Sequence, residues 1–183
     1  MSAEIRNTGI EIVGSVPWGT HFCQFYQTPQ DLLDTLVPFL KAGLESNEAC
    51  VWVTSDPLTP DDARRALNQS VPDLDRYAAN GQIEIFPHTA WYLKDGYFDM
   101  DRVLKGWVEK YEQGLARGCT GLRVTGNTAW LDKKDWKSFA DYEAAINGII
   151  GKYRMLAVHY FWQDLFWKRK NEHIEWLDKL VRL

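Results

Sequence analysis

The 183-residue sequence lacks the features that several large protein classes require. No segment approaches the ~20 apolar residues that a membrane-spanning helix needs, and residues 1–6 lack the apolar run of a secretory signal. The formal net charge is −4, and no basic stripe interleaved with aromatic residues is present, so direct nucleic-acid binding is not expected. We therefore expect a cytoplasmic protein that contacts neither membrane nor nucleic acid.

Cysteine is scarce, which limits both covalent and metal-based cross-linking. Cys23, Cys50 and Cys119 are an odd number of cysteines without C-x-x-C spacing. This argues against a disulfide framework and against a zinc finger. We interpret Cys50 and Cys119 as ordinary buried or boundary thiols.

A complete phosphate-binding loop is also missing. Such a loop needs glycines whose backbone amides wrap the phosphates, followed by a lysine that meets their charge. Gly14 and Gly19 have the glycine spacing, but Thr20 and His21 stand where Lys and Ser or Thr belong. The other candidate turn, at residues 26–31, has neither glycine nor lysine. Hydrolysis of a nucleotide triphosphate is therefore not expected.

A repeated strand–turn–helix pattern is the clearest positive signal in the chain. Residues 21–26 have strand character and lead to Thr28, a helix-capping residue that precedes a proline and, at the third helical position, a carboxylate. The apolar run 49–54 leads to Thr59 with the same signature. This repetition predicts an α/β fold with parallel strands.

Hydrophobic periodicity predicts the remaining elements and the domain boundary. Strands are expected at residues 21–26, 49–54, 83–86, 121–127 and 155–160, and helices at about 30–45, from 60 onward, at 73–79, from 99 onward and at 134–152. Residues 1–20 are expected to be irregular. We predict one domain over residues 1–160, followed by an amphipathic helix within residues 161–183.

Aromatic residues are unusually abundant, with nine Trp, eight Tyr and eight Phe. They either line an apolar pocket or reflect dense packing. The connection at residues 87–98 is longer than the usual loop of about 2–6 residues, so we expect a lid or a pocket wall there. The carboxyl ends of parallel strands form the edge where ligands bind, and Ser55, Asp56 and His159 are also expected at this edge. The candidate ligand-binding residues are His21, Cys23, Tyr26, His88, Trp91, Tyr92, Thr125, Asn127 and Trp130.

His21 and Cys23 also allow two other chemistries. Strand alternation places them on one face, roughly 7 Å apart, too far for a direct nucleophile–base hydrogen bond. A thiol enzyme would need His88 or His159 from another strand. The same pair could supply two metal ligands, with His88 or His159 completing the site. The alternative is a buried thiol and a hydrogen-bonded histidine.

Taken together, these residues resemble the MEDS domain family, the sensory domain found in regulators of methanogenesis and methylotrophy and in many bacterial histidine kinases. The resemblance spans about residues 17–157 and rests on Gly19-Thr20-His21-Phe22-Cys23-Gln24-Phe25-Tyr26, Phe39-Leu40-Lys41-Ala42-Gly43-Leu44, Val51-Trp52-Val53-Thr54, Trp91-Tyr92-Leu93, Gly121-Leu122-Arg123-Val124-Thr125-Gly126-Asn127, Trp130 and Lys134-Asp135-Trp136. The sequence departs from the family pattern after Met155.

The resemblance implies a RecA-like three-layer α/β domain with a mostly parallel central sheet of about five strands and a degenerate phosphate loop. Such domains are thought to sense small hydrocarbon derivatives. The family's His-x-Cys pair is matched by His21 and Cys23, which implies a ligand or metal role for these two residues.

We therefore expect a non-catalytic regulatory domain that binds a small organic ligand and needs no cofactor. It would signal to a histidine kinase or a transcriptional regulator, in cis or in trans. Alternatives are a metal-binding or thiol enzyme using His21 and Cys23, or a protein-interaction adaptor. In the C-terminal segment, Ile174, Leu177 and Val181 form a narrow apolar stripe. This stripe packs either on the domain's own surface or on the same helix of a second subunit, and we expect the second arrangement, a homodimer.

Overall fold

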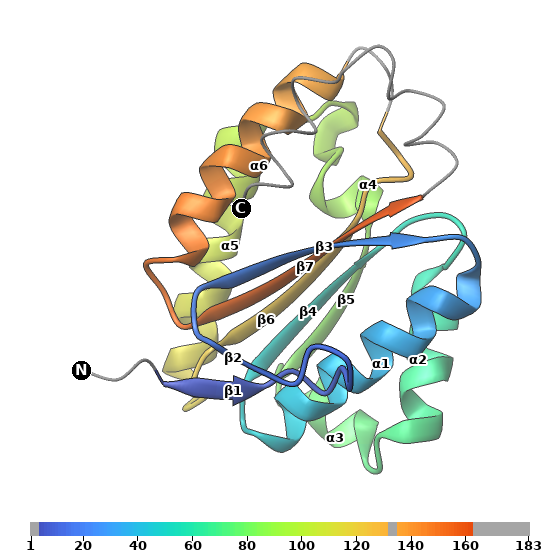
Figure 1. The fold of residues 1–183 in the computed structure, drawn as a ribbon, viewed down its shortest axis with the longest axis vertical. Helices are drawn as coiled ribbons and strands as arrows, with labels where there is room; N and C mark the ends of the chain where they lie inside the picture. The colour runs from blue at the N-terminus through green and yellow to red at the C-terminus, as the bar shows by residue number, and fades with distance from the viewer. Residues whose placement is uncertain (1–3, 132–134, 163–183) are drawn as a thin grey trace.

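A five-stranded parallel sheet forms the centre of the protein (Figure 1), as seen in a computed structural model that describes residues 4–131 and 135–162. The strands are β3 (Thr20–Tyr26), β4 (Ala49–Thr54), β5 (Ile83–Pro87), β6 (Leu122–Asn127) and β7 (Met155–Trp162). Their order is β3-β7-β6-β4-β5, and every adjacent pair is parallel. The predicted parallel α/β fold is confirmed.

Helices cover both faces of this sheet, which gives three layers (Figure 1). The helices α1 (Pro29–Glu45), α2 (Pro60–Ser70) and α3 (Leu74–Ala79) pack on one face, called here the α1 face. The helices α5 (Met100–Ala116) and α6 (Trp136–Ile150) pack on the other, the α6 face. Each face has its own buried apolar cluster, because successive strand side chains point to opposite sides.

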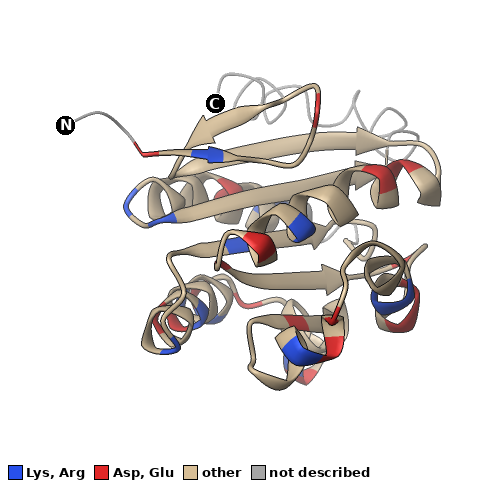
Figure 2. Cartoon of the chain, turned by 90° about the horizontal axis from the view of Figure 1, so that it is seen from below, with Lys and Arg blue, Asp and Glu red and all other residues tan. Residues whose placement is uncertain are grey.

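Charged residues lie mainly on helices and turns (Figure 2), and β3, β4 and β7 carry none. Arg123 is an exception, since it is a charged residue within the strand β6. Its side chain is fully buried on the α1 face. Strands covered on both sides read as continuous apolar runs, and this is why their positions could be predicted.

The predicted helix starts are confirmed in detail. Thr28 and Asp31 form a capping box at α1, and Thr59 and Asp62 form the same box at α2. The side chain of Asp99 caps α5 by accepting a hydrogen bond from a backbone N–H. These caps satisfy backbone donors that have no partner within the first turn of a helix.

The long connection at residues 87–98 is mostly regular structure. It contains α4 (His88–Trp91) and the 3₁₀ turn η1 (Lys94–Gly96). Arg102 of α5 fixes it by donating from Nη1 to the Trp91 carbonyl at 2.7 Å and from Nη2 to the Tyr92 carbonyl at 3.0 Å. The segment therefore packs as a wall against the α6 face.

The expectation that residues 1–20 are irregular was wrong. They contain β1 (Ile5–Asn7) and β2 (Ser15–Pro17), an antiparallel ribbon that lies beside α1 (Figure 1). Arg123 holds this ribbon by donating to the carbonyl of Asn7 at 2.7 Å and to that of Thr8 at 3.0 Å. Strands of three residues are too short to show a period of two, so only the tertiary contacts reveal them.

Some boundaries also differ. The strand β7 continues two residues beyond the predicted end at 160, and α6 is shorter than the expected 134–152. The predicted C-terminal helix, with Ile174, Leu177 and Val181, lies outside the described residues. Within the described ranges, no helix has the length and apolar character needed to cross a membrane.

Candidate functional site

The sheet has a topological switch point between β4 and β6. From β4 the chain crosses the α1 face to β5, whereas from β6 it crosses the α6 face to β7, in the opposite direction. In open α/β sheets, ligands bind outside the carboxyl ends of strands at such a point. The fold therefore predicts a ligand-binding site at residues 54–56 and 125–127.

A small hollow lies at this point, on the α1 face, and we call it the switch-point hollow. Its apolar wall comes from Leu32, Leu36, Trp52 and Leu58. The other described residues that line it are Val53, Thr54, Ser55, Thr125, Gly126, Asn127 and Tyr160, none of them charged. Its free volume is about 10 Å³, room for no more than one water molecule, so an uncharged organic ligand would enter only if the lining side chains move apart.

Three hydroxyl groups of this lining are buried without a hydrogen-bond partner among the described residues. They belong to Ser55, Thr125 and Tyr160. Burial raises the pKa of Tyr160 well above its ordinary value, so its hydroxyl remains neutral. Buried polar groups are nearly always paired, so unpaired hydroxyls in one hollow point to a ligand or a water.

The Asn127 amide, in contrast, has a hydrogen-bond partner at both its oxygen and its nitrogen. Its Oδ1 accepts from the Tyr26 hydroxyl at 3.1 Å, and its Nδ2 donates to the Asp56 carbonyl at 3.0 Å. Burial raises the pKa of Tyr26 to about 12, so this hydroxyl is a donor at neutral pH. Asn127 thus joins the carboxyl ends of β3, β4 and β6 at the rim of the hollow.

The sequence-predicted site residues do not form a single group. Tyr26, Thr125 and Asn127 lie on the α1 face, near the hollow. The others lie on the α6 face or beside it, and they are His21, Cys23, His88, Trp91, Tyr92 and Trp130. Alternation along β3 accounts for the division between His21 and Tyr26.

The aromatic residues of the α6 face pack against one another. Tyr92 stacks on Trp130 with ring centroids 5.0 Å apart, and Trp91 lies 4.3 Å from Trp107. The Trp107 Nε1 donates to the Tyr142 hydroxyl at 2.8 Å. On this face the aromatic excess contributes to dense packing, and Tyr92 is 1% exposed.

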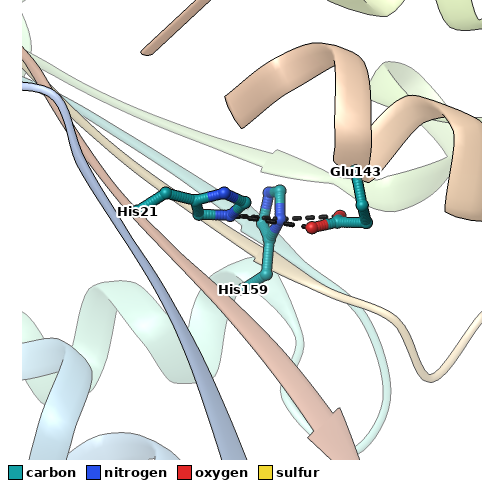
Figure 3. Close-up of side chains that lie close together, drawn as sticks. All are labelled: His21, Glu143 and His159. Carbon is teal, nitrogen blue, oxygen red and sulfur yellow. Dashed lines mark hydrogen bonds and ion pairs between the residues drawn. The ribbon is translucent and has the colours of Figure 1, made fainter. Parts of the chain in front are cut away.

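His21, His159 and Glu143 meet on the α6 face and are called here the His–Glu cluster (Figure 3). The imidazoles approach from the adjacent strands β3 and β7, and the carboxylate reaches them from α6. The His21 Nε2 lies 3.0 Å from the His159 Nδ1, which lies 2.8 Å from a Glu143 oxygen. His159, and not His88, is therefore the partner of His21.

The cluster is buried and incompletely paired. The side chains of His21, His159 and Glu143 are 4%, 1% and 2% exposed. Burial, and then the nearby His159, lower the pKa of His21 to about 4 despite the opposing Glu143 carboxylate. Neither carboxylate oxygen of Glu143 has a hydrogen-bond partner in the described chain.

Cys23 lies on the same face as His21 and is exposed. Partial desolvation, and then the Glu143 carboxylate, raise the pKa of its thiol above the ordinary value. The thiol therefore stays protonated at neutral pH, which makes it a poor nucleophile. Cys50 and Cys119 are buried free thiols, as predicted.

The sequence analysis did not include Glu143 among the candidate site residues, although its position in the sequence is unusual. It falls on the apolar stripe of α6, four residues after Phe139 and three before Ile146, both of which are buried. A lone carboxylate on the buried stripe of a helix is unusual unless it is paired or binds a metal.

Comparison with solved structures identifies the fold. The chain is similar to a KaiC-like protein from the hyperthermophilic archaeon Pyrococcus horikoshii, with a TM-score of 0.63 and 17% sequence identity. The match covers 86% of this chain and 71% of that protein. At this identity the likeness shows the fold alone, a RecA-like α/β domain. No curated protein matches the sequence.

Comparison with family models identifies the family. The model described as MEDS: MEthanogen/methylotroph, DcmR Sensory domain matches residues 20–166, which include every strand of the sheet. The match extends over most of the chain and agrees with the resemblance carried by residues 19–26 and 121–127. The chain belongs to the MEDS family of sensory domains.

Proposed function

We propose that this protein is a non-catalytic sensory domain whose ligand binds in the switch-point hollow. The family supports a regulatory sensor role, and the carrying observation is the set of unpaired hydroxyls of Ser55, Thr125 and Tyr160 in an uncharged hollow. The ligand we propose is a small neutral hydrocarbon derivative with one oxygen-containing group.

The energetics favour such a molecule. A buried hydroxyl without a partner costs about 1–3 kcal/mol, and a ligand oxygen that pairs with these groups recovers part of that cost. Leu32, Leu36 and Leu58 are buried and pack closely around the hollow, so they offer apolar surface to the hydrocarbon part, at roughly 25 cal/mol per Å² buried, only once the hollow widens. A carboxylate or phosphate would find no cation in the described lining.

Two observations support a role without catalysis. The turn between β3 and α1 consists of residues 27–28 and contains no glycine or lysine, so it lacks the groups that hold nucleotide phosphates. The ordinary pKa of a thiol already lies above neutral pH, and partial desolvation raises the pKa of Cys23 further, so its thiolate is a minor form. The output we propose is a change in a histidine kinase or a transcriptional regulator, in cis or in trans, with the sensory chain acting as a homodimer.

The test is a binding titration with defined probes. We expect one- to four-carbon alcohols, added to isotope-labelled protein, to shift the backbone NMR signals of Ser55, Thr125 and Tyr160. Thr125→Val should weaken alcohol binding at least tenfold, because it removes one hydroxyl and keeps the side-chain shape. The control is Thr120→Val, since Thr120 lies before β6 at the opposite end of that strand.

Two outcomes would refute the proposal. One is the absence of saturable shifts with every alcohol. The other is binding that Thr125→Val leaves unchanged, because the ligand would then occupy a different place.

A further inference from the structure

We propose that His21, His159 and Glu143 form a binding site for a divalent transition-metal ion of the zinc class. The site lies on the α6 face, on the other side of the sheet from the switch-point hollow. The inference is independent of the proposed ligand, because it depends on different residues and different chemistry.

The spacing of the ligand atoms fits a metal ion. One nitrogen from each histidine and an oxygen of Glu143 all lie within 4.8 Å of one another. The separations are 3.0 Å between the two nitrogens, 2.8 Å from His159 to Glu143 and 3.7 Å from His21 to Glu143. A tetrahedral ion with bonds of about 2.0–2.2 Å holds its ligand atoms about 3.3–3.6 Å apart. The observed values bracket that range.

Hydrogen bonding alone leaves the cluster unsatisfied. The His159 Nδ1 carries at most one proton, yet it has the His21 nitrogen and a Glu143 oxygen as close neighbours. The Glu143 oxygens make no well-aligned hydrogen bond in the described chain, and the nitrogens that they face are 2.8 Å away on His159 and 3.7 Å away on His21. No lysine or arginine of the described chain forms an ion pair with this carboxylate. A bound cation would satisfy the carboxylate and both nitrogens together.

The donor set indicates the class of metal. Two imidazoles and one carboxylate suit zinc and other late first-row ions, whereas magnesium and calcium prefer oxygen ligands alone. Three protein ligands leave a further coordination position for water or a small molecule. The Cys23 sulfur is not among the converging atoms, so the thiol on the same face offers a matched control.

The arrangement also predicts what the metal does to the protein. His21 belongs to the edge strand β3, His159 to β7, and Glu143 to α6. An ion bound by all three would connect these elements directly. Binding to the folded state alone raises stability by mass action, so a rise in melting temperature is an assay that needs no knowledge of function.

The experiment uses the whole purified chain, stripped with a chelator and titrated with Zn²⁺ by calorimetry. We expect one ion per chain and a higher melting temperature with Zn²⁺ present. Glu143→Gln, which keeps the side-chain shape, should weaken Zn²⁺ binding by no less than the roughly 10–100-fold that loss of an outer-shell partner costs, and should abolish the shift. Glu112→Gln, on the exposed surface of α5, and Cys23→Ser should leave both unchanged.

Cobalt(II) gives a second readout. The spectrum of the Co²⁺-loaded protein should lack a thiolate charge-transfer band, because the ligands are nitrogen and oxygen. The proposal is overturned if the folded wild-type chain binds no zinc-class ion, if Glu143→Gln binds Zn²⁺ as tightly as wild type, or if Cys23→Ser abolishes binding. None of these results decides whether an alcohol binds in the hollow.

Discussion

Thr125 and Thr128 lie three residues apart at the end of β6, and both are buried, yet their hydroxyls have opposite environments. The Thr128 Oγ1 donates to the Tyr160 carbonyl at 2.8 Å. The Thr125 Oγ1 has no partner among the described residues. Replacing each threonine by valine therefore compares how an unpaired and a paired buried hydroxyl contribute to the free energy of unfolding.

We predict opposite effects on stability in the absence of ligand. Thr125→Val should raise the free energy of unfolding by about 1 kcal/mol, because a methyl group replaces a buried hydroxyl that makes no hydrogen bond. Thr128→Val should lower it by about 1 kcal/mol, because the hydrogen bond of the Thr128 hydroxyl is lost and the Tyr160 carbonyl keeps only the backbone N–H of Thr128 as a donor. Urea denaturation of both variants measures the difference. An equal loss at both positions would mean that the Thr125 hydroxyl is paired in solution.

At the scale of elements, the contact between Tyr92, at the end of α4, and β6 depends on Gly126. An ideal Cβ at this position would overlap the Tyr92 hydroxyl and would lie 3.1 Å from the His159 Cδ2. Tyr92 is fully buried and hydrogen-bonds with Tyr142. The glycine is therefore required by close approach of a side chain and not by a turn.

We predict that Gly126→Ala lowers the free energy of unfolding by about 1–3 kcal/mol through overpacking. Tyr92→Phe removes the overlapping oxygen, so in its background Gly126→Ala should cost clearly less. A double-mutant cycle by chemical denaturation measures this coupling. Strict additivity would show that the alanine methyl group is accommodated elsewhere.

The helices and strands could be predicted from the sequence to a greater extent than the contacts between them. The strands of the sheet and the caps at Thr28 and Thr59 could be predicted, since they depend on neighbours within a few residues. The His21–Glu143 contact joins residues far apart in sequence, so no local pattern reveals it. His159 was recognised only as one of two histidines that could join His21. The distribution of the predicted site residues over both faces of the sheet also required the strand order.

At the scale of the whole molecule, Arg123 connects the N-terminal ribbon to the domain. Its Nε donates to the buried Glu48 carboxylate, and its Nη1 donates to the Phe39 carbonyl at 2.8 Å. Arg6 of β1 lies 2.7 Å from the same Glu48 carboxylate. The ribbon, α1 and β6 thus share one buried network of charges and hydrogen bonds.

We predict that Arg123→Met lowers the free energy of unfolding by about 3–5 kcal/mol, because it leaves Glu48 buried without its fully buried partner. Lys105→Met is the control, since Lys105 pairs with Glu109 on the exposed surface and should matter by less than about 1 kcal/mol. Thermal and urea unfolding report both values. A loss below 1 kcal/mol for Arg123→Met would show that the network is not needed for stability.

Adjacent residues of β7 face the two proposed sites. His159 belongs to the His–Glu cluster on one face, and Tyr160 lines the switch-point hollow on the other. One peptide unit separates them, so a displacement of β7 caused by either occupant reaches the other. Thermodynamic linkage then requires reciprocity: whatever factor the metal applies to ligand affinity, the ligand must apply to metal affinity. If β7 couples the two sites in this way, the affinity of the domain for an organic molecule would depend on whether the metal site is occupied. The domain would then respond to the two ligands jointly.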